Sequence, residues 1–246
     1  MARRRFYVEV VTGGSAEITG PAAQHLRKVL RVEPGQRYEI TDGRQAYLAE
    51  VTGFRKGSVS LDVLEELPAE LLPVELELRA ALVKFDHFEW MIEKATELGV
   101  VRIVPVIAVR SEHGLEKAAL KRSERWRRIA VEAAQQCRRT TVPEIAGVAR
   151  HRDAIREEAT YRFVLEESEA PPFLDRLPAG RRRSDRVALL VGPEGGWTDE
   201  EREAAQAAGW QPVSLGPLIL RAETAAIAGL SVVNAAWLAQ QAPGKR

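Results

Sequence analysis

Two stretches near the C-terminus decide the fold: residues 187–198 read VALLVGPEGGWT, and residues 215–226 read LGPLILRAETAA. In the first, an apolar run leads directly into a glycine-rich turn, and Thr198 then begins a helix with Glu201 placed to complete a capping box. This order is typical of a parallel α/β sheet, which presents backbone N–H groups to a ligand at the carboxyl ends of its strands. The second stretch follows one strand later, so the two loops are predicted to meet at one pocket.

The rest of the chain divides into two regions with different patterns. Residues 1–70 contain short strands separated by glycine turns, with one helix near residues 22–32, and predict a small β-barrel domain. From residue 71 to residue 246, strands alternate with helices, which predicts an α/β domain with a mainly parallel sheet. A helix capped by Asp86, with Glu89 completing a capping box, and a longer helix over residues 123–139 belong to this second domain.

The composition excludes several classes of protein. The 246 residues have a formal net charge of +1, with 45% hydrophobic and 29% charged residues, as in ordinary folded proteins. Cys137 is the only cysteine and the histidines lack metal-ligand spacing, so we expect neither disulfides nor a metal. No apolar run approaches the length of a membrane span and no signal peptide is recognised, which predicts a cytoplasmic protein without a membrane partner.

The glycine-rich turn does not fit the common nucleotide-binding motifs. A P-loop requires a lysine after its glycines, and a dinucleotide-binding motif follows the first strand of its domain. This turn meets neither condition, and Glu194 within it would repel a phosphate. The residues therefore favour a ligand with a positive centre and no phosphate, of which S-adenosylmethionine is one, while an ordinary tight turn is the alternative.

Taken together, the two loops resemble the RsmE family, the uridine-N3 methyltransferases of small-subunit (16S) ribosomal RNA in the SPOUT superfamily. The resemblance covers nearly the whole chain, including Lys84 and the segments at residues 25–31, 93–99, 110–111 and 132–139. It implies a PUA-like β-barrel over residues 1–70, followed over residues 71–246 by a SPOUT methyltransferase domain with a C-terminal trefoil knot. It also implies a homodimer, S-adenosylmethionine as methyl donor, and ribosomal RNA or the small ribosomal subunit as partner.

The cofactor site implied by the resemblance uses three loops of this chain: the end of the strand near residue 165 and the two stretches quoted above. Leu215, Leu218 and Leu220 are expected to enclose the adenine, while backbone groups satisfy its nitrogens. The expected cofactor-binding residues are Leu165, Glu166, Gly192, Pro193, Glu194, Gly195, Gly196, Leu215, Gly216, Leu218, Leu220, Arg221, Ala222, Thr224 and Ala225.

Methylation of uracil N3 requires removal of the N3 proton and stabilisation of negative charge on the flanking carbonyl oxygens. Arg221, Glu223 and Thr224 supply a cation, a carboxylate and a hydroxyl at one loop-to-helix junction. We therefore expect Arg221 to position or stabilise the uracil, with Glu223 or Glu194 as the catalytic base. Helix capping is the alternative role for Glu223 and Thr224, since acidic residues favour helix N-termini.

Clustered basic residues are predicted to hold the RNA backbone, where they position the substrate without specifying its sequence. A solvated charged surface is the alternative interpretation of the same clusters. The expected RNA-binding residues are Arg3, Arg4, Arg5, Arg27, Lys28, Arg31, Arg44, Arg110, Arg138 and Arg139.

The C-terminal helix, near residues 223–240, is too apolar for a helix that buries a single stripe, which predicts burial against the sheet and at a dimer interface.

Two other functions are compatible with the sequence. One is a related knotted methyltransferase acting on another RNA, such as a transfer RNA 2′-hydroxyl. The other is a noncatalytic RNA-binding assembly factor, which would not bind S-adenosylhomocysteine.

Overall fold

The computed structural model describes residues 5–112, 114–167 and 169–241, which form two compact units. The first unit contains the chain up to Leu71 together with Val131–Val142, and the second contains Leu72–Ala130 and the chain from Pro143 onward. The division after Leu71 lies close to the predicted boundary. The segment Val131–Val142, however, packs with the first unit although its place in the sequence put it in the second domain.

The first unit is built on a six-stranded sheet in the order β1-β4-β5-β6-β3-β2, in which β1 and β4 are parallel and the other neighbours are antiparallel. The single helix begins and ends earlier than the sequence predicts, with Pro21 in its first turn. The elements are β1 (Arg5–Tyr7), β2 (Val11–Thr12), β3 (Ser15–Thr19), α1 (Gly20–Lys28), β4 (Arg37–Thr41), β5 (Ala46–Arg55) and β6 (Ser58–Leu67).

Hydrogen bonds explain why residues 138–140 belong to the first unit. Tyr7 donates its hydroxyl to the carbonyl of Arg139 (3.0 Å), and Thr41 donates to the carbonyl of Thr140 (3.0 Å). The buried guanidinium of Arg5 donates from Nη1 to Thr140 Oγ1 (3.1 Å). Burial raises the pKa of Tyr7, so its hydroxyl stays a donor at every physiological pH.

The second unit contains the predicted parallel α/β sheet. Its strands follow the order β10-β8-β7-β12-β11-β13, with β9 pairing β8, and every pair of neighbours is parallel. The strands are β7 (Glu75–Ala81), β8 (Arg102–Ile107), β9 (Glu144–Ile145), β10 (Ala149–Arg150), β11 (Tyr161–Leu165), β12 (Arg186–Val191) and β13 (Gln211–Val213). The helices are α2 (Phe85–Glu97), α3 (Leu115–Leu120), α4 (Ser123–Gln136), α5 (His151–Ala154), η1 (Phe173–Arg176), α6 (Asp199–Ala207) and α7 (Ala222–Gln241).

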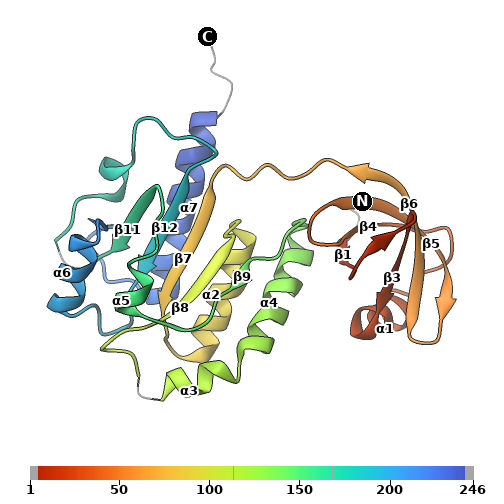
Figure 1. Cartoon of the computed structure of the whole chain (residues 1–246), viewed down its shortest axis with the longest axis horizontal. Helices are drawn as coiled ribbons and strands as arrows, with labels where there is room; N and C mark the ends of the chain where they lie inside the picture. Colours follow the sequence, from red (N-terminus) through yellow and green to blue (C-terminus); the bar gives the residue numbers. More distant parts are fainter. Residues whose placement is uncertain (1–4, 113, 168, 242–246) are drawn as a thin grey trace, which may run out of the picture. The chain divides into compact units, whose positions relative to one another are not determined.

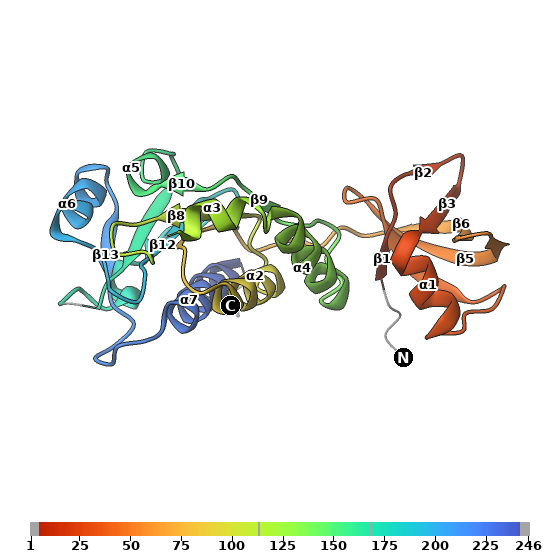
Figure 2. The same ribbon diagram turned by 90° about the horizontal axis from the view of Figure 1, so that it is seen from below.

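Strand β12 is central and is covered on both faces. Ala188 and Leu190 pack in a cluster with Trp197 and Trp210, on the face that also carries α5 and α6. The opposite face is covered by α7, which contacts α2 along its length (Figures 1 and 2). Burial on both faces explains the unbroken apolar run in this strand, since a half-exposed strand would alternate apolar and polar residues.

One of the two predicted helix caps is present. Thr198 Oγ1 accepts from the backbone N–H of Glu201 (3.2 Å), and the Glu201 carboxylate accepts from the N–H of Thr198 (3.0 Å), so the capping box of α6 is confirmed. The cap predicted at Asp86 is wrong, because α2 begins at Phe85, before that residue. Glu89 instead accepts hydrogen bonds from Arg122, just before α4, and from Arg125 in the first turn of α4.

Helix α7 is long and apolar enough to cross a membrane by length and composition alone, which the sequence analysis did not anticipate. Part of the helix is buried within the second unit, as in the core helix of a folded protein, and Trp237 donates from Nε1 to Asp185 Oδ2 (3.0 Å). Its buried residues are Ala222, Glu223, Ala226, Gly229, Leu230, Val233 and Trp237.

The closest approach of α7 to the sheet yields a stability prediction. A Cβ at Gly229 would lie 2.8 Å from Leu189 Cδ2 and 3.2 Å from Leu165 Cδ1. We expect Gly229→Val to lower the free energy of unfolding by about 1–3 kcal/mol through overpacking, measured by urea denaturation. Ala235→Val, at an exposed position of the same helix, should change it by less than about 0.5 kcal/mol. Equal stability of the two variants would contradict this packing.

Candidate active site

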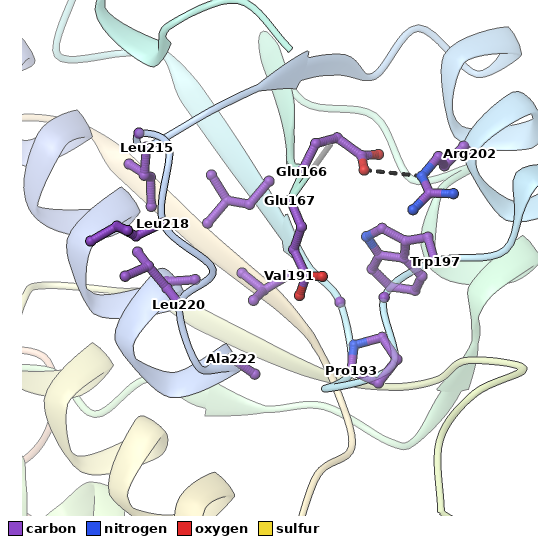
Figure 3. A pocket seen from close by; sticks show the side chains of 15 residues that line it. Glu166, Glu167, Val191, Pro193, Trp197, Arg202, Leu215, Leu218, Leu220 and Ala222 are labelled. Carbon is purple, nitrogen blue, oxygen red and sulfur yellow. Dashed lines mark hydrogen bonds and ion pairs between the residues drawn. The ribbon is translucent and has the colours of Figure 1, made fainter. Parts of the chain in front are cut away.

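A pocket lies at the carboxyl ends of β11 and β12 and is closed by the segment that leads from β13 into α7 (Figure 3). The empty space inside it, which includes open solvent at its mouth, is about 580 Å³. The lining residues are Leu165, Glu166, Glu167, Val191, Gly192, Pro193, Gly196, Trp197, Arg202, Leu215, Gly216, Leu218, Leu220, Ala222 and Ala225.

The two C-terminal loops therefore meet at one pocket, as their sequences predict. Leu215, Leu218 and Leu220 form an apolar wall, and Trp197 and Arg202 lie across the pocket from them (Figure 3). Most of the residues expected to bind a cofactor line this pocket. Four of them do not line the pocket, although each is the direct sequence neighbour of a lining residue: Glu194, Gly195, Arg221 and Thr224.

Four lining residues were missed by the sequence analysis: Glu167, Val191, Trp197 and Arg202. Adjacency to predicted residues was a usable signal for Glu167, Val191 and Trp197. Arg202 has no predicted site residue next to it in the sequence, because it lies on α6 and reaches the pocket by contacting Glu166 at the end of β11. Its Nε donates to Glu166 Oε2 (3.0 Å), which neutralises a carboxylate whose side chain is only 5% exposed.

Glycine is required at two positions of the turn after β12. The turn is closed by a hydrogen bond from the N–H of Gly196 to the carbonyl of Pro193 (2.9 Å), and Gly196 has a φ of 65°, in the left-handed region. At Gly192 a Cβ would lie 3.1 Å from the indole ring of Trp197, which is buried beneath the turn. The backbone can therefore approach a ligand here without an intervening side chain.

Contacts from behind hold the same turn in place. Arg110 Nη1 donates to the carbonyl of Gly195 (2.8 Å), and Glu201 Oε1 accepts from the N–H of Val109 (2.9 Å). The imidazole of His151 packs on Trp197, with ring centroids 4.9 Å apart. Burial lowers the pKa of His151, with Glu201 opposing the shift, which favours a neutral ring against the indole.

Both carboxylates proposed as a base lie near the N-terminus of α2. The imidazole of His87 on this helix has its Nδ1 3.6 Å from Glu223 Oε1 and 3.7 Å from Glu194 Oε1. Glu223 is buried, whereas the side chain of Glu194 is 55% exposed. His87 was not among the residues predicted for the site, because nothing in the sequence indicates that this helix meets the two loops.

Arg221 and Thr224 are exposed at the start of α7, next to the pocket residues Ala222 and Ala225. The carbonyl of Arg221 accepts from the N–H of Ala225 (2.8 Å), which closes the first turn of the helix. Within the described part of the chain, no group of three or more His, Cys, Asp or Glu side chains is placed to hold a metal ion.

The expected RNA-binding residues fall into different environments. The side chains of Arg27, Lys28, Arg31 and Arg44 are exposed on the first unit. Arg138 is partly exposed and pairs with Glu39 (2.8 Å), and Arg110 is engaged at the Gly195 turn. Arg3 and Arg4 lie outside the described residues.

Arg5 and Arg139 are not placed to bind RNA, which corrects the sequence-based expectation. Both side chains are only 6% exposed. Arg5 forms ion pairs with Glu39 (3.1 Å) and Glu70, and Arg139 donates from Nη2 to Thr141 Oγ1 (3.3 Å). Their charges are used inside the first unit, so neither belongs to an RNA-binding surface.

Comparison with known proteins identifies the family. Residues 70–234 match the RNA methyltransferase domain family. Ribosomal RNA small subunit methyltransferase E of Aquifex aeolicus is 31% identical over 235 residues, with 93% of this chain and 97% of that protein covered. The Bacillus subtilis protein of the same name is 32% identical over 250 residues, with 94% and 96% covered. The chain belongs to the RsmE family.

Solved structures of RsmE-like proteins share the fold. Ribosomal RNA small subunit methyltransferase E from Neisseria gonorrhoeae, bound to S-adenosyl methionine, has a TM-score of 0.86 and 30% identity, and the match covers 96% of this chain and 98% of that one. A methyltransferase from Legionella pneumophila in complex with the same cofactor has a TM-score of 0.86 and 31% identity, with the same coverage.

Proposed function

We propose that this protein is an S-adenosylmethionine-dependent methyltransferase that modifies N3 of a uridine in the 16S ribosomal RNA of the small subunit. The observation that carries the proposal is the single pocket built by both C-terminal loops in a chain of the RsmE family. The family member from Neisseria gonorrhoeae was solved with S-adenosyl methionine bound. Bound in this pocket, the cofactor would supply an electrophilic methyl group.

The chemistry of the lining residues fits this cofactor. The wall of Leu215, Leu218 and Leu220 suits the adenine, and the glycine turn offers backbone groups to its polar atoms. Glu166 is neutralised by Arg202, whereas Glu167 brings a further carboxylate to the pocket, which suits a ligand with a positive centre. The cofactor-binding set is therefore the pocket lining. Glu194, Gly195, Arg221 and Thr224 lie beside it, and the side chain of Arg221 is proposed to act on the uracil and not on the cofactor.

The residues around the mouth of the pocket support chemistry at uracil N3. Arg221 provides a permanent cation at the start of α7, where it would stabilise negative charge on the carbonyl oxygens beside N3. Glu194 and Glu223 provide negative charge close to the same helix N-terminus, as base or as partner of a base. A 2′-hydroxyl acceptor needs no charge stabilisation on uracil carbonyls, so this arrangement favours N3.

The RNA is proposed to contact the exposed basic residues Arg27, Lys28, Arg31 and Arg44 of the first unit, together with Arg138. The six-stranded sheet with its single helix supports the proposal of a PUA-like β-barrel in this unit. In the second unit the chain leaves the edge strand β13, passes the pocket and returns as α7 against the central strands β12 and β7, which supports the proposed SPOUT-type trefoil knot.

A homodimer acting in the cytoplasm completes the proposal. Large apolar side chains remain exposed on and near α7: Leu174, Leu218, Ile219 and Leu238 are each more than 60% exposed. Exposed apolar residues that gather around one helix are typical of a protein–protein interface. Leu218 and Ile219 lie in the loop that closes the pocket, and Leu174 lines a hollow with Val232 of α7, which supports a dimer formed through this side of the second unit.

The proposed reaction is tested by nucleoside analysis of 16S ribosomal RNA from a strain that lacks the gene. We expect 3-methyluridine to be absent from that strain and restored by the wild-type gene. Arg221→Ala should fail to restore it, with turnover lowered about 100-fold or more, because charge on the uracil carbonyls is no longer stabilised. Its affinity for S-adenosylhomocysteine should stay within about twofold of wild type by calorimetry. Normal turnover by this variant would remove Arg221 from the mechanism.

The cofactor loop gives a separate prediction. A Cβ at Gly192 would lie 3.1 Å from the indole of Trp197, which is buried, so Gly192→Ala should displace the turn and weaken S-adenosylhomocysteine binding about tenfold or more. Gly180→Ala is the matched control, because a Cβ there meets no atom within 4 Å. Titration calorimetry of the two variants decides the matter, and unchanged affinity in Gly192→Ala would place the cofactor elsewhere.

RNA binding by the first unit is expected to depend strongly on salt. Replacing both Arg27 and Lys28 by alanine removes two proposed phosphate contacts and should lower the slope of log affinity against log salt by about 1–2. Affinity should weaken to a similar extent for RNA fragments of unrelated sequence. Arg152→Ala, an exposed arginine of the second unit, is the control. An unchanged slope in the double variant would exclude this surface.

A further inference from the structure

His87 joins the two carboxylates proposed to act at uracil N3. It lies on the first turn of α2, whereas Glu194 is in the turn after β12 and Glu223 is on the first turn of α7. The imidazole Nδ1 faces both, at 3.7 Å from Glu194 Oε1 and 3.6 Å from Glu223 Oε1. We propose that His87 is the base that takes the N3 proton, with Glu223 and Glu194 compensating the charge it acquires. This inference rests on the proposed N3 methylation.

The polar atoms of this cluster lack the partners that a purely structural role would provide. Both His87 Nδ1 and Glu223 Oε2 are buried without a hydrogen-bond partner in the described part of the chain. Glu223 is 7% exposed, so its carboxylate is held in a nearly dry environment next to the pocket residue Ala222. Unpaired buried polar atoms are costly, and a catalytic role is one of the reasons for which native proteins keep them. Apo active sites commonly show such loose contacts, which tighten when substrate binds.

The arrangement resembles the general form of an oriented base. A buried carboxylate beside one ring nitrogen favours the tautomer with the proton on that nitrogen and leaves the lone pair on the other nitrogen available. Here Glu223 faces Nδ1 at 3.6 Å, and in the proposal Nδ1 carries the proton and Nε2 the basic lone pair. Among the described residues, Asp86 on the same helix also lies near the ring, with its Oδ2 3.8 Å from Nε2 and its side chain 79% exposed.

An imidazole is a better base for this step than either carboxylate. A neutral imidazole accepts a proton more readily than a carboxylate, and histidine is the side chain that enzymes use most often as a general base. The positive charge formed on the ring would lie within 4 Å of two carboxylate oxygens. That charge is therefore stabilised where it develops, without a movement of either loop.

The N3–H bond breaks, its proton goes to His87 Nε2, and its electron pair stays on N3. N3 forms a bond to the methyl carbon of the donor, and the carbon–sulfur bond breaks with its electron pair going to sulfur, which gives neutral S-adenosylhomocysteine. The imidazolium faces Glu223 and Glu194 and later releases its proton to water.

The test compares His87→Asn with wild type in single-turnover methylation of 16S ribosomal RNA between pH 7 and 10. The asparagine amide keeps a polar group near Nδ1 but has no base at the place of Nε2. We expect the rate to fall about 100-fold or more at pH 7, and the deficit to shrink at high pH, where uracil loses its N3 proton unaided. S-adenosylhomocysteine affinity should stay within about twofold of wild type.

Two further variants make the result decisive. Glu223→Gln keeps the shape of the side chain and should slow the reaction with unchanged S-adenosylhomocysteine affinity, because the imidazolium loses its buried partner. Glu93→Gln, a half-buried position on the same helix that pairs with Lys94, should behave as wild type.

A deficit in His87→Asn that is constant across the pH range, or a matching loss of S-adenosylhomocysteine affinity, would show a structural role and overturn the inference. Full activity of His87→Asn would do the same while leaving the proposed function intact. If wild-type protein forms no 3-methyluridine, the proposed function fails, and this inference fails with it.

Discussion

The structure of the second unit depends on the burial of both faces of β12. One face packs against the cluster that includes Trp197 and Trp210, and the other lies against α7, which approaches so closely that a Cβ at residue 229 would lie 2.8 Å from Leu189 Cδ2. The chain leaves the sheet at Gly192, and the buried indole of Trp197 packs against the turn at this residue. The same strand thus positions the glycine turn and the helix that follows the second loop.

This constraint brings together segments that are far apart in the sequence. The turn at residues 192–196 and the loop at residues 215–222 enclose the pocket, and the N-terminus of α2 meets both through His87. The apolar wall and the charged cluster are supplied by different elements, so we expect mutations to separate cofactor binding from the proposed proton transfer. Arg221 lies at the junction of these two regions, next to Ala222 in the pocket lining.

The parts of this organisation that depend on local sequence could be predicted. The apolar run before Gly192 predicts a doubly buried parallel strand, and the Thr198–Glu201 spacing predicts the cap that is present. Features that depend on distant contacts could not. The local sequence does not show that Arg202 neutralises Glu166 or that His87 faces two carboxylates. Nor does it show that the side chains of Arg5 and Arg139 are buried, because an arginine in a basic cluster has the same sequence pattern whether it binds a phosphate or a buried glutamate.

The most direct test of the account is a crystal structure of the protein with S-adenosylhomocysteine. We expect the adenine against Leu215, Leu218 and Leu220, the backbone of residues 192–196 within hydrogen-bonding distance of the ligand, and its sulfur facing the side of the pocket where Arg221 and His87 lie. A ligand bound away from these two loops, or loops that separate and leave the pocket empty at saturating ligand, would contradict the account.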